Sequence, residues 1–132
     1  MSGGYEWHVR FGDVDAAGVI YYPRLFDRVV RAVGAVMDDV GYPFAGLVDD
    51  GVGFPIVHAE IDLVRPIRLG ETVSLGVAPT VGETSVEFDV DCRVDGTLVA
   101  EASQTQTLID LETFEPTAIP TDLRDRLERL VE

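Results

Sequence analysis

One amphipathic segment, residues 23–40, constrains the fold of this chain more than any other feature. Its apolar side chains recur three and four positions apart, which is the period of a helix with one buried face. Pro23 can open this helix because the first helical position makes no use of its N–H, and Gly41 can end it. Valines and Gly34 lower its intrinsic propensity, so packing against another layer must stabilise it. The predicted buried face comprises Phe26, Val29, Val30, Val33, Val36, Met37 and Val40.

Most of the remaining chain alternates between apolar and polar residues, as half-buried strands do. Residues 83–94 show this best, and the Asp95-Gly96 pair that follows is a strong signal for a two-residue hairpin turn. Residues 5–11 alternate in the same way, and their predicted buried side comprises Tyr5, Trp7, Val9 and Phe11. The other predicted strands are residues 55–64, 72–79 and 97–111, and a short helix is predicted over residues 121–131.

Five strands and one long helix each offer a single apolar face, and packing the helix on the sheet buries both. Because strands twist, the sheet is expected to curl round the helix. The sequence therefore predicts an α+β fold, a five-stranded antiparallel sheet wrapped around one long central helix, as a single domain over residues 1–132. The unpaired edges of such a sheet favour a homodimer or a homotetramer.

The chain is strongly acidic, with 24 Asp and Glu against 10 basic residues, all of them Arg, and a net charge of −14. Such a field repels nucleic acid and anionic membranes, so neither is expected as a partner. The hydrophobic fraction of 46% is too high for a disordered acidic tail. Excess carboxylate without Lys is typical of halophilic proteins, which work at high intracellular salt where self-repulsion is screened. We therefore expect the protein to lose structure at low salt.

Several other classes of site are not indicated by the sequence. Cys92 is the single cysteine, so neither an intrachain disulfide nor a cysteine-based metal cluster is expected. The chain shows no membrane-length apolar run and no signal-peptide pattern, so a cytoplasmic location is expected. It also shows no phosphate-binding P-loop, no Gly-x-Ser-x-Gly elbow and no metal-spaced His pair. We therefore expect no metal site.

The stretch between the first strand and the long helix, residues 11–23, carries the candidate chemistry. Asp13 and Asp15 precede a Gly-rich bend, and the predicted helix begins directly after it. Backbone N–H groups at a helix start are unpaired and carry partial positive charge. A carboxylate that faces such donors suits acyl-transfer chemistry. The alternative interpretation is a plain strand-to-helix connection with acidic, solubilising residues.

This bend resembles the active-site segment of the 4-hydroxybenzoyl-CoA thioesterase family of hot-dog-fold proteins. The family pattern is an Asp, two small residues, a Gly, two apolar residues and an aromatic pair, and residues 15–22 are similar to it throughout. Residues 54–57 and 65–71 also resemble family segments, and the likeness extends over roughly residues 5–127. The resemblance implies a hot-dog fold and an acyl-CoA thioesterase that hydrolyses a small or medium acyl-CoA to the free acid and CoA. It implies no cofactor other than the CoA of the substrate.

The resemblance also implies a role for each matching residue. Asp15 would be the nucleophile or the general base for water, and the backbone N–H of Tyr22 would polarise the thioester carbonyl. Gly18 would let the backbone approach the thioester, and the side chains of Tyr21 and Tyr22 would wall the pocket. Asp13 would be structural, and it is the second candidate for the catalytic carboxylate after Asp15. Because a hot-dog active site lies between two subunits, the partner would line the acyl pocket with Phe54, Pro55, Ile56 and His58.

One departure from the family pattern concerns CoA. Some members carry a basic cluster before the fourth strand that holds the CoA phosphates, whereas residues 81–85 here contain one acid and no base. Either salt screens the repulsion, or the acyl carrier differs, or other residues bind the CoA phosphates. The candidates for that last case are Arg65, Arg68, Arg93, Arg124, Arg126 and Arg129. Two alternatives stay open. A hot-dog dehydratase or hydratase would need a His with an acid, and His8 and His58 both lie outside the bend. A non-catalytic acyl-thioester-binding dimer would need no reactive group.

Overall fold

The structure, a computed structural model, describes residues 2–131. In chain order its elements are β1 (Ser2–His8), the 3-10 turn η1 (Phe11–Asp13), α1 (Tyr22–Asp39), α2 (Phe44–Asp49), β2 (Val52–Gly53), β3 (Ile56–Leu63), β4 (Thr72–Val81), β5 (Ser85–Val94), β6 (Thr97–Thr107), β7 (Ile109–Asp110) and α3 (Thr121–Arg129). None of the helices over these residues combines the length and the apolar character that a membrane crossing requires.

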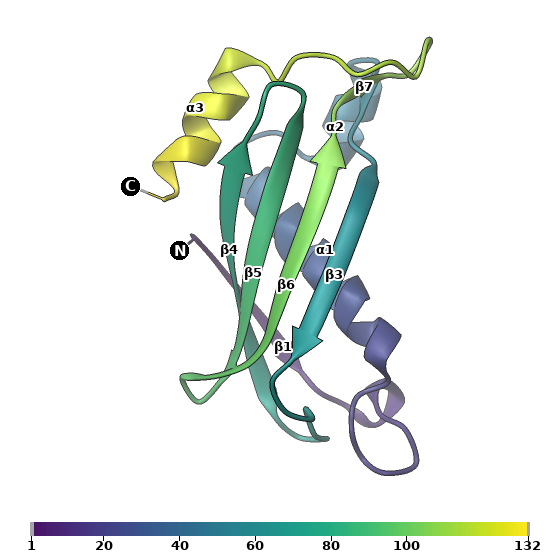
Figure 1. Cartoon of the computed structure of the whole chain (residues 1–132), viewed down its shortest axis with the longest axis vertical. Helices are drawn as coiled ribbons and strands as arrows, with labels where there is room; N and C mark the ends of the chain where they lie inside the picture. The colour runs from purple at the N-terminus through teal and green to yellow at the C-terminus, as the bar shows by residue number, and fades with distance from the viewer. Residues whose placement is uncertain (1, 132) are drawn as a thin grey trace.

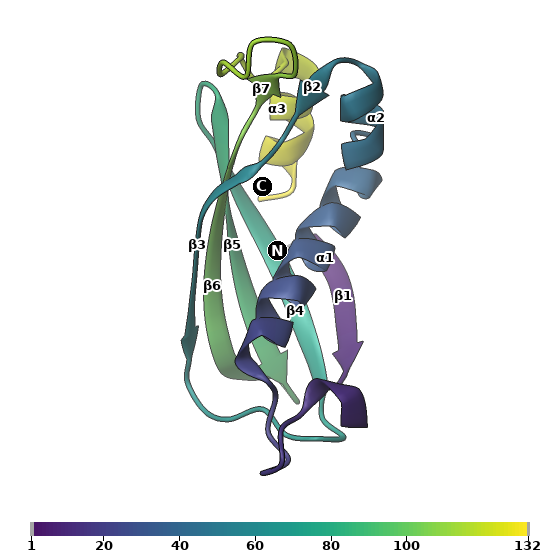
Figure 2. The same cartoon turned by 90° about the vertical axis from the view of Figure 1, so that its right-hand side faces the viewer.

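Five strands form one antiparallel sheet in the order β1-β4-β5-β6-β3 (Figure 1). Figure 2 shows α1 lying across one face of this sheet, which bends around it. The short strands β2 and β7 make a separate two-stranded pair. The predicted α+β arrangement, a five-stranded antiparallel sheet around one long helix, is therefore confirmed.

The core lies between α1 and the sheet, and it follows the two periods read from the sequence. On β5 every second residue from Val86 to Val94 is buried. The inward face of α1 comprises Leu25, Val29, Ala32, Val33, Val36 and Met37. The predicted helix face is thus largely right, although Phe26 and Val30 lie at its half-buried margin. The Asp95-Gly96 hairpin is also confirmed, because both residues have the positive φ, 50° and 79°, that a type I′ turn requires.

The first predicted strand is wrong at its C-terminal end. Trp7 and Val9 are buried as expected, but β1 ends at His8 and Phe11 is 84% exposed. The reason is a local hydrogen bond: Asp13 N–H donates to Arg10 O at 2.9 Å, which coils residues 11–13 into η1 and turns Phe11 outward.

The last predicted strand, residues 97–111, is two strands rather than one. β6 ends at Thr107, and Leu108 N–H donates to Thr84 O at 2.8 Å, one step further along the β5–β6 register. The chain leaves the large sheet there, and β7 pairs with β2 instead. The predicted C-terminal helix is present as α3, which lies near the end of the sheet where β4 and β5 join (Figure 1).

Candidate active site

The bend between β1 and α1 is held as a small antiparallel ladder. Val14 pairs with Ile20, and Val19 pairs in turn with Arg68, in the segment that precedes β4. Within the bend, Asp15 N–H donates to Val19 O at 2.8 Å. The bend is therefore a hydrogen-bonded part of the fold, and its residues have defined positions.

Asp15 lies at the turn of this ladder, and backbone donors orient its side chain. Its Oδ1 accepts hydrogen bonds from Ala17 N–H at 2.8 Å and from Val19 N–H at 3.4 Å. Gly18 permits the turn, because its φ of 79° lies in the left-handed region that favours glycine. The carboxylate is exposed, and its Oδ2 has no hydrogen-bond partner within residues 2–131. One carboxylate oxygen is thus held in place and the other is available for reaction.

An open hollow of about 450 Å³ lies beside Asp15. Its wall is formed by Phe11, Val14, Asp15, Ala16, Gly18 and Leu69. Phe11 and Leu69 are 84% and 47% exposed, so two large apolar side chains face solvent next to the carboxylate. Neither residue is predicted from the sequence as a site residue. The sequence assigns Phe11 to the buried side of a strand, and Leu69 comes from a distant segment, before β4. The signal that could have found Phe11 is its place directly before the Gly12-Asp13 turn.

The start of α1 follows the bend directly and has no side-chain cap. Arg24 N–H donates to Tyr21 O at 2.8 Å, and Pro23 has no N–H. Tyr22 N–H lies in the first turn and has no acceptor within the helix. In α1, which is described throughout, the first turn contains no acidic residue, so the partial positive charge of this helix end is not offset by the helix itself. A backbone donor and an unengaged carboxylate oxygen therefore lie on the same bend.

Asp13 anchors the bend from inside and is 7% exposed. Its Oδ2 accepts hydrogen bonds from Arg10 N–H at 2.9 Å and from Trp7 Nε1–H at 3.2 Å. Arg28 and Arg24 approach its Oδ1 at 3.8 and 3.9 Å. Burial alone would raise the pKa of Asp13, but these hydrogen bonds and the two guanidinium charges outweigh it and hold the pKa below its ordinary value of 3.8.

The backbone of Asp13 also fixes the far end of the bend. Its carbonyl oxygen accepts a hydrogen bond from Tyr21 N–H at 2.8 Å, directly before the first residue of α1. The side chain and the carbonyl of Asp13 together tie β1, η1 and the helix start to one point. This arrangement agrees with the expected structural role of Asp13.

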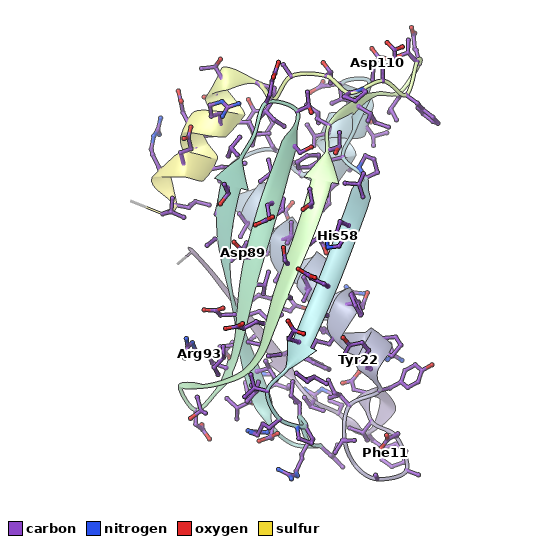
Figure 3. All side chains as sticks on the ribbon, viewed as in Figure 1. Phe11, Tyr22, His58, Asp89, Arg93 and Asp110 are labelled. Atoms are coloured by element: carbon purple, nitrogen blue, oxygen red, sulfur yellow. The ribbon has the colours of Figure 1, made fainter. Side chains whose placement is uncertain are left out.

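The two tyrosines of the bend have different surroundings. Tyr21 is 60% exposed. The Tyr22 hydroxyl donates to Ile61 O of β3 at 2.7 Å, and its ring packs edge-on against Phe26 with centroids 5.5 Å apart. Figure 3 shows Tyr22 beside the lower end of β3, on the side of the molecule that carries Phe11. The Tyr22 side chain therefore links the start of α1 to an edge strand of the sheet.

The residues expected to come from the partner lie elsewhere in this chain. Phe54 is in the core, in edge-on contact with Phe44 and Phe88 at centroid distances of 6.4 and 6.3 Å, and not on the surface as a pocket residue would be. Pro55, Ile56 and His58 are exposed. Ile56 lies five residues before Ile61 on β3, a separation of about 16 Å along a strand. One chain alone does not bring these residues to Asp15, so their role stays a prediction.

Other reactive groups are not assembled at the hollow. His8 Nδ1 is 2.8 Å from Thr72 Oγ1, and His58 Nε2 is 3.8 Å from Glu60. Neither histidine lines the hollow with Asp15, as a dehydratase or hydratase would require. Burial raises the pKa of the Cys92 thiol to about 12, with Asp91 adding to the shift, so this sulfur is not a nucleophile in the folded protein. Among residues 2–131 no group of three or more His, Cys, Asp or Glu could hold a metal ion.

Comparison with known proteins identifies the family. The Thioesterase-like superfamily matches residues 9–127. The 1,4-dihydroxy-2-naphthoyl-CoA hydrolase of Synechococcus elongatus is 31% identical over 123 residues, 91% of this chain and 90% of the relative. The structure of a 1,4-dihydroxy-2-naphthoyl-CoA thioesterase from Synechocystis has a TM-score of 0.90 at 21% identity, over 98% of both chains. A gentisyl-coenzyme A thioesterase has a TM-score of 0.84 at 25% identity, over 93% of this chain and 98% of that one.

The sheet, the long helix and these matches define a protein of the hot-dog thioesterase fold. The chain belongs to the Thioesterase-like superfamily, whose model covers most of its length. The prediction of a hot-dog acyl-CoA thioester hydrolase is thereby confirmed. The roles of Asp15, Gly18, Tyr21 and Tyr22 stay predictions that rest on the geometry described above.

Proposed function

We propose that this protein hydrolyses the thioester bond of an aromatic acyl-CoA, with Asp15 and the start of α1 as its reactive groups. The observation that carries the proposal is the position of the Asp15 carboxylate. One oxygen is fixed by its own turn, the other is unengaged, and the side chain lies in the wall of an apolar hollow. A thioester suits such a site, because its thiol leaves readily and a positioned oxygen nucleophile does most of the chemistry.

In the proposed mechanism, Tyr22 N–H donates to the thioester carbonyl and the positive end of α1 stabilises the oxyanion that forms. Asp15 then acts in one of two ways. As a nucleophile, it bonds to the carbonyl carbon, CoA leaves as the C–S bond breaks, and water cleaves the resulting anhydride. As a general base, it takes a proton from a water that forms the new C–O bond and passes that proton to the leaving sulfur. Either route consumes one water and yields one acid and one thiol.

An aromatic acyl group fits both the hollow and the relatives. By their names, two of the relatives act on 1,4-dihydroxy-2-naphthoyl-CoA and gentisyl-CoA, and both acyl groups are hydroxylated aromatic acids. In this chain Phe11 and Leu69 present apolar surface beside Asp15. Aromatic rings pack favourably on an aromatic side chain in offset or edge-on contact. The substrate class we assign is therefore a hydroxylated aromatic acyl-CoA.

The proposal includes a second copy of the chain. β3 forms one edge of the sheet, and of its eight residues only Ile61 is buried. Ile56, Val57 and Leu63 expose large apolar side chains along it. Pairing with another strand stabilises such an edge, and a two-fold axis at the middle of β3 supplies an antiparallel copy. The partner's Ile56 would then approach this chain's Leu63. The partner's His58 would approach the hydrogen bond between Tyr22 and Ile61, close to the bend.

Thiol release over a panel of acyl-CoAs tests the proposal. We expect hydroxybenzoyl-CoA and hydroxynaphthoyl-CoA to be cleaved with a kcat/KM about tenfold or more above that of straight-chain acyl-CoAs. Equal or faster cleavage of the straight-chain esters would remove the aromatic assignment. Binding of every ester without release of thiol would favour the non-catalytic binding dimer.

A further inference from the structure

The arginines of this acidic chain are mostly engaged by acids or carbonyls. Arg65 makes a bidentate pair with Glu71, at 3.0 and 2.9 Å. The other arginine ion pairs in the described chain join Arg24 and Arg28 to Asp13, Arg31 to Asp27, Arg93 to Asp91 and Arg126 to Asp122. Arg124 donates to Gly82 O at 2.7 Å. Within residues 2–131 this leaves Arg10, Arg68 and Arg129 with neither an ion pair to a carboxylate nor a side-chain hydrogen bond to a carbonyl.

Arg68 is distinguished from the others by its place in the ladder of the bend. Val14 pairs with Ile20, which sets Asp15 opposite Val19, and Val19 pairs with Arg68. Residues directly opposite in antiparallel strands point to the same face. Because neighbouring strands lie 4.7–4.9 Å apart, the Cα atoms of Asp15 and Arg68 are about 10 Å apart in one row. Both side chains are exposed.

The backbone under Arg68 is fixed. Arg68 N–H donates to Glu71 Oε1 at 2.7 Å, and the next residue, Leu69, donates its N–H to Gly18 O at 3.0 Å. Arg65 holds the carboxylate of Glu71 in a bidentate pair, and the Arg68 guanidinium acts on the same carboxylate only from beyond ion-pair distance. Arg68 thus offers an unengaged guanidinium on a rigid base, in the same row as Asp15.

We propose that Arg68 binds a phosphate group of the CoA portion of the substrate. This inference rests on the proposed function, because it takes Asp15 as the position of the thioester. The pantetheine arm between the thioester sulfur and the first phosphate has somewhat fewer backbone bonds than five extended residues and spans about 15 Å. A row spacing of about 10 Å plus an arginine side chain that extends along the row, away from Asp15, reaches that span. A guanidinium binds phosphate through two parallel hydrogen bonds, and in a protein of net charge −14 one such cation decides where a polyanion can dock.

Two thioesters of the same acyl group test this assignment. One is the CoA ester, and the other is the N-acetylcysteamine ester, which has the same reacting atoms and no phosphate. For Arg68→Gln we expect KM for the CoA ester to rise about tenfold, with kcat for that ester and kcat/KM for the N-acetylcysteamine ester unchanged. Arg31→Gln is the control, because Arg31 is also exposed, pairs with Asp27 on α1 and is not among the candidates for phosphate binding. It should change none of these constants.

The outcomes separate this assignment from the proposed function. If the wild-type protein cleaves neither ester, the proposed function fails. If it cleaves both and Arg68→Gln affects them equally or affects neither, the phosphate assignment fails. Arg68→Lys keeps the charge but loses the bidentate geometry, so its KM for the CoA ester should lie between those of wild type and Arg68→Gln. This variant also provides the test if the glutamine variant does not fold.

Discussion

Asp15 and Asp110, in two distant regions of the molecule, each accept side-chain hydrogen bonds from the backbone of the turn that follows them. The Oδ1 of Asp110 accepts backbone hydrogen bonds from Glu112 at 2.8 Å and Thr113 at 3.2 Å, much as that of Asp15 does in the bend. Each turn also has an exposed phenylalanine nearby, Phe11 at one and Phe114 at the other. Figure 3 shows Phe11 and Asp110 at opposite ends of the sheet.

What differs is the element that follows each turn. After Asp15 the chain enters α1 directly, so an uncapped helix start lies on the same bend. After Asp110 the next helix, α3, starts only at Thr121. A carboxylate held by its own turn is therefore not specific to the candidate site, and only one of these two turns leads straight into a helix. The comparison predicts that only Asp15 is reactive.

The largest expected effect comes from changing each aspartate to asparagine. Asp15→Asn should lower kcat for an aromatic acyl-CoA by about a hundredfold or more, since the amide can neither attack nor accept a proton. Asp110→Asn should leave kcat unchanged. Both variants should keep the wild-type Tm, because an amide oxygen can accept the same backbone hydrogen bonds. Matched activities in the two variants would remove the distinction between the turns.

Asp13 provides the next test, because the Asp110 turn has no described counterpart to this buried anchor. Asp13→Ala leaves the N–H of Arg10 and the indole N–H of Trp7 without their acceptor, which should cost about 2 kcal/mol or more of unfolding free energy. Chemical denaturation at neutral pH measures this. An unchanged denaturation midpoint would show that the bend does not depend on Asp13.

The pH dependence of the same variant sharpens the test. The folded-state pKa of Asp13 lies below the ordinary value of 3.8. Its stabilisation is therefore complete above that value and is lost as pH falls through the folded-state pKa. Below about pH 4 the stability of the wild type should fall more steeply than that of Asp13→Ala, which has no carboxyl group to protonate at this site. If the unfolding free energies of the two proteins fell equally steeply below about pH 4, the lowered pKa of Asp13 would be contradicted.

Gly18 and Gly96 give a smaller effect and a matched pair. Both have a φ of 79°, and an added Cβ would meet no atom within 4 Å at either position. Alanine at each should therefore cost about 1–2 kcal/mol through backbone strain alone. Only Gly18→Ala should also lower kcat, because Gly18 belongs to the turn that orients Asp15. Equal kcat values in the two variants would mean that the turn geometry is not limiting.

The smallest expected effect is the screening by salt of repulsion between neighbouring carboxylates. Glu101 pairs with Asp62 on one side and with Asp91 on the other, so three carboxylates lie in one row across β3, β6 and β5. Each like-charged pair of this kind costs about 0.2–1 kcal/mol, and salt screens it. The Tm should rise between dilute buffer and molar salt, while the activity ratio of wild type to Asp15→Asn stays the same. A Tm independent of salt would contradict the halophilic interpretation.

The sequence predicts the fold well where a period runs for several turns. Residues 23–40 and 83–94 repeat long enough to fix both the element and its buried face. It fails where a bond between distant segments decides the path of the chain. The chain leaves the large sheet after β6 and pairs with β2 as β7, and no local pattern contains that pairing.

The same limit applies to the candidate site. Asp15, Gly18 and Tyr22 are contiguous on one bend, so a short motif identifies them. The hollow is different, because Leu69 reaches it from the segment before β4, and only the folded chain brings Leu69 to Asp15. Phe54 shows that neighbouring residues of one motif can have different surroundings. Its neighbours Pro55 and Ile56 are exposed, whereas its own ring packs between Phe44 and Phe88.

The burial of Cys92 has a practical consequence for measuring this enzyme. Cys92 is the single sulfhydryl group of the chain, it is wholly inaccessible, and its pKa of about 12 keeps it protonated. Disulfide dyes that detect liberated CoA therefore receive no background from intact enzyme. A slow additional reaction of the dye, up to one equivalent per chain, then measures the fraction of molecules that have unfolded and exposed Cys92. A single cuvette can thus report turnover and loss of native structure together.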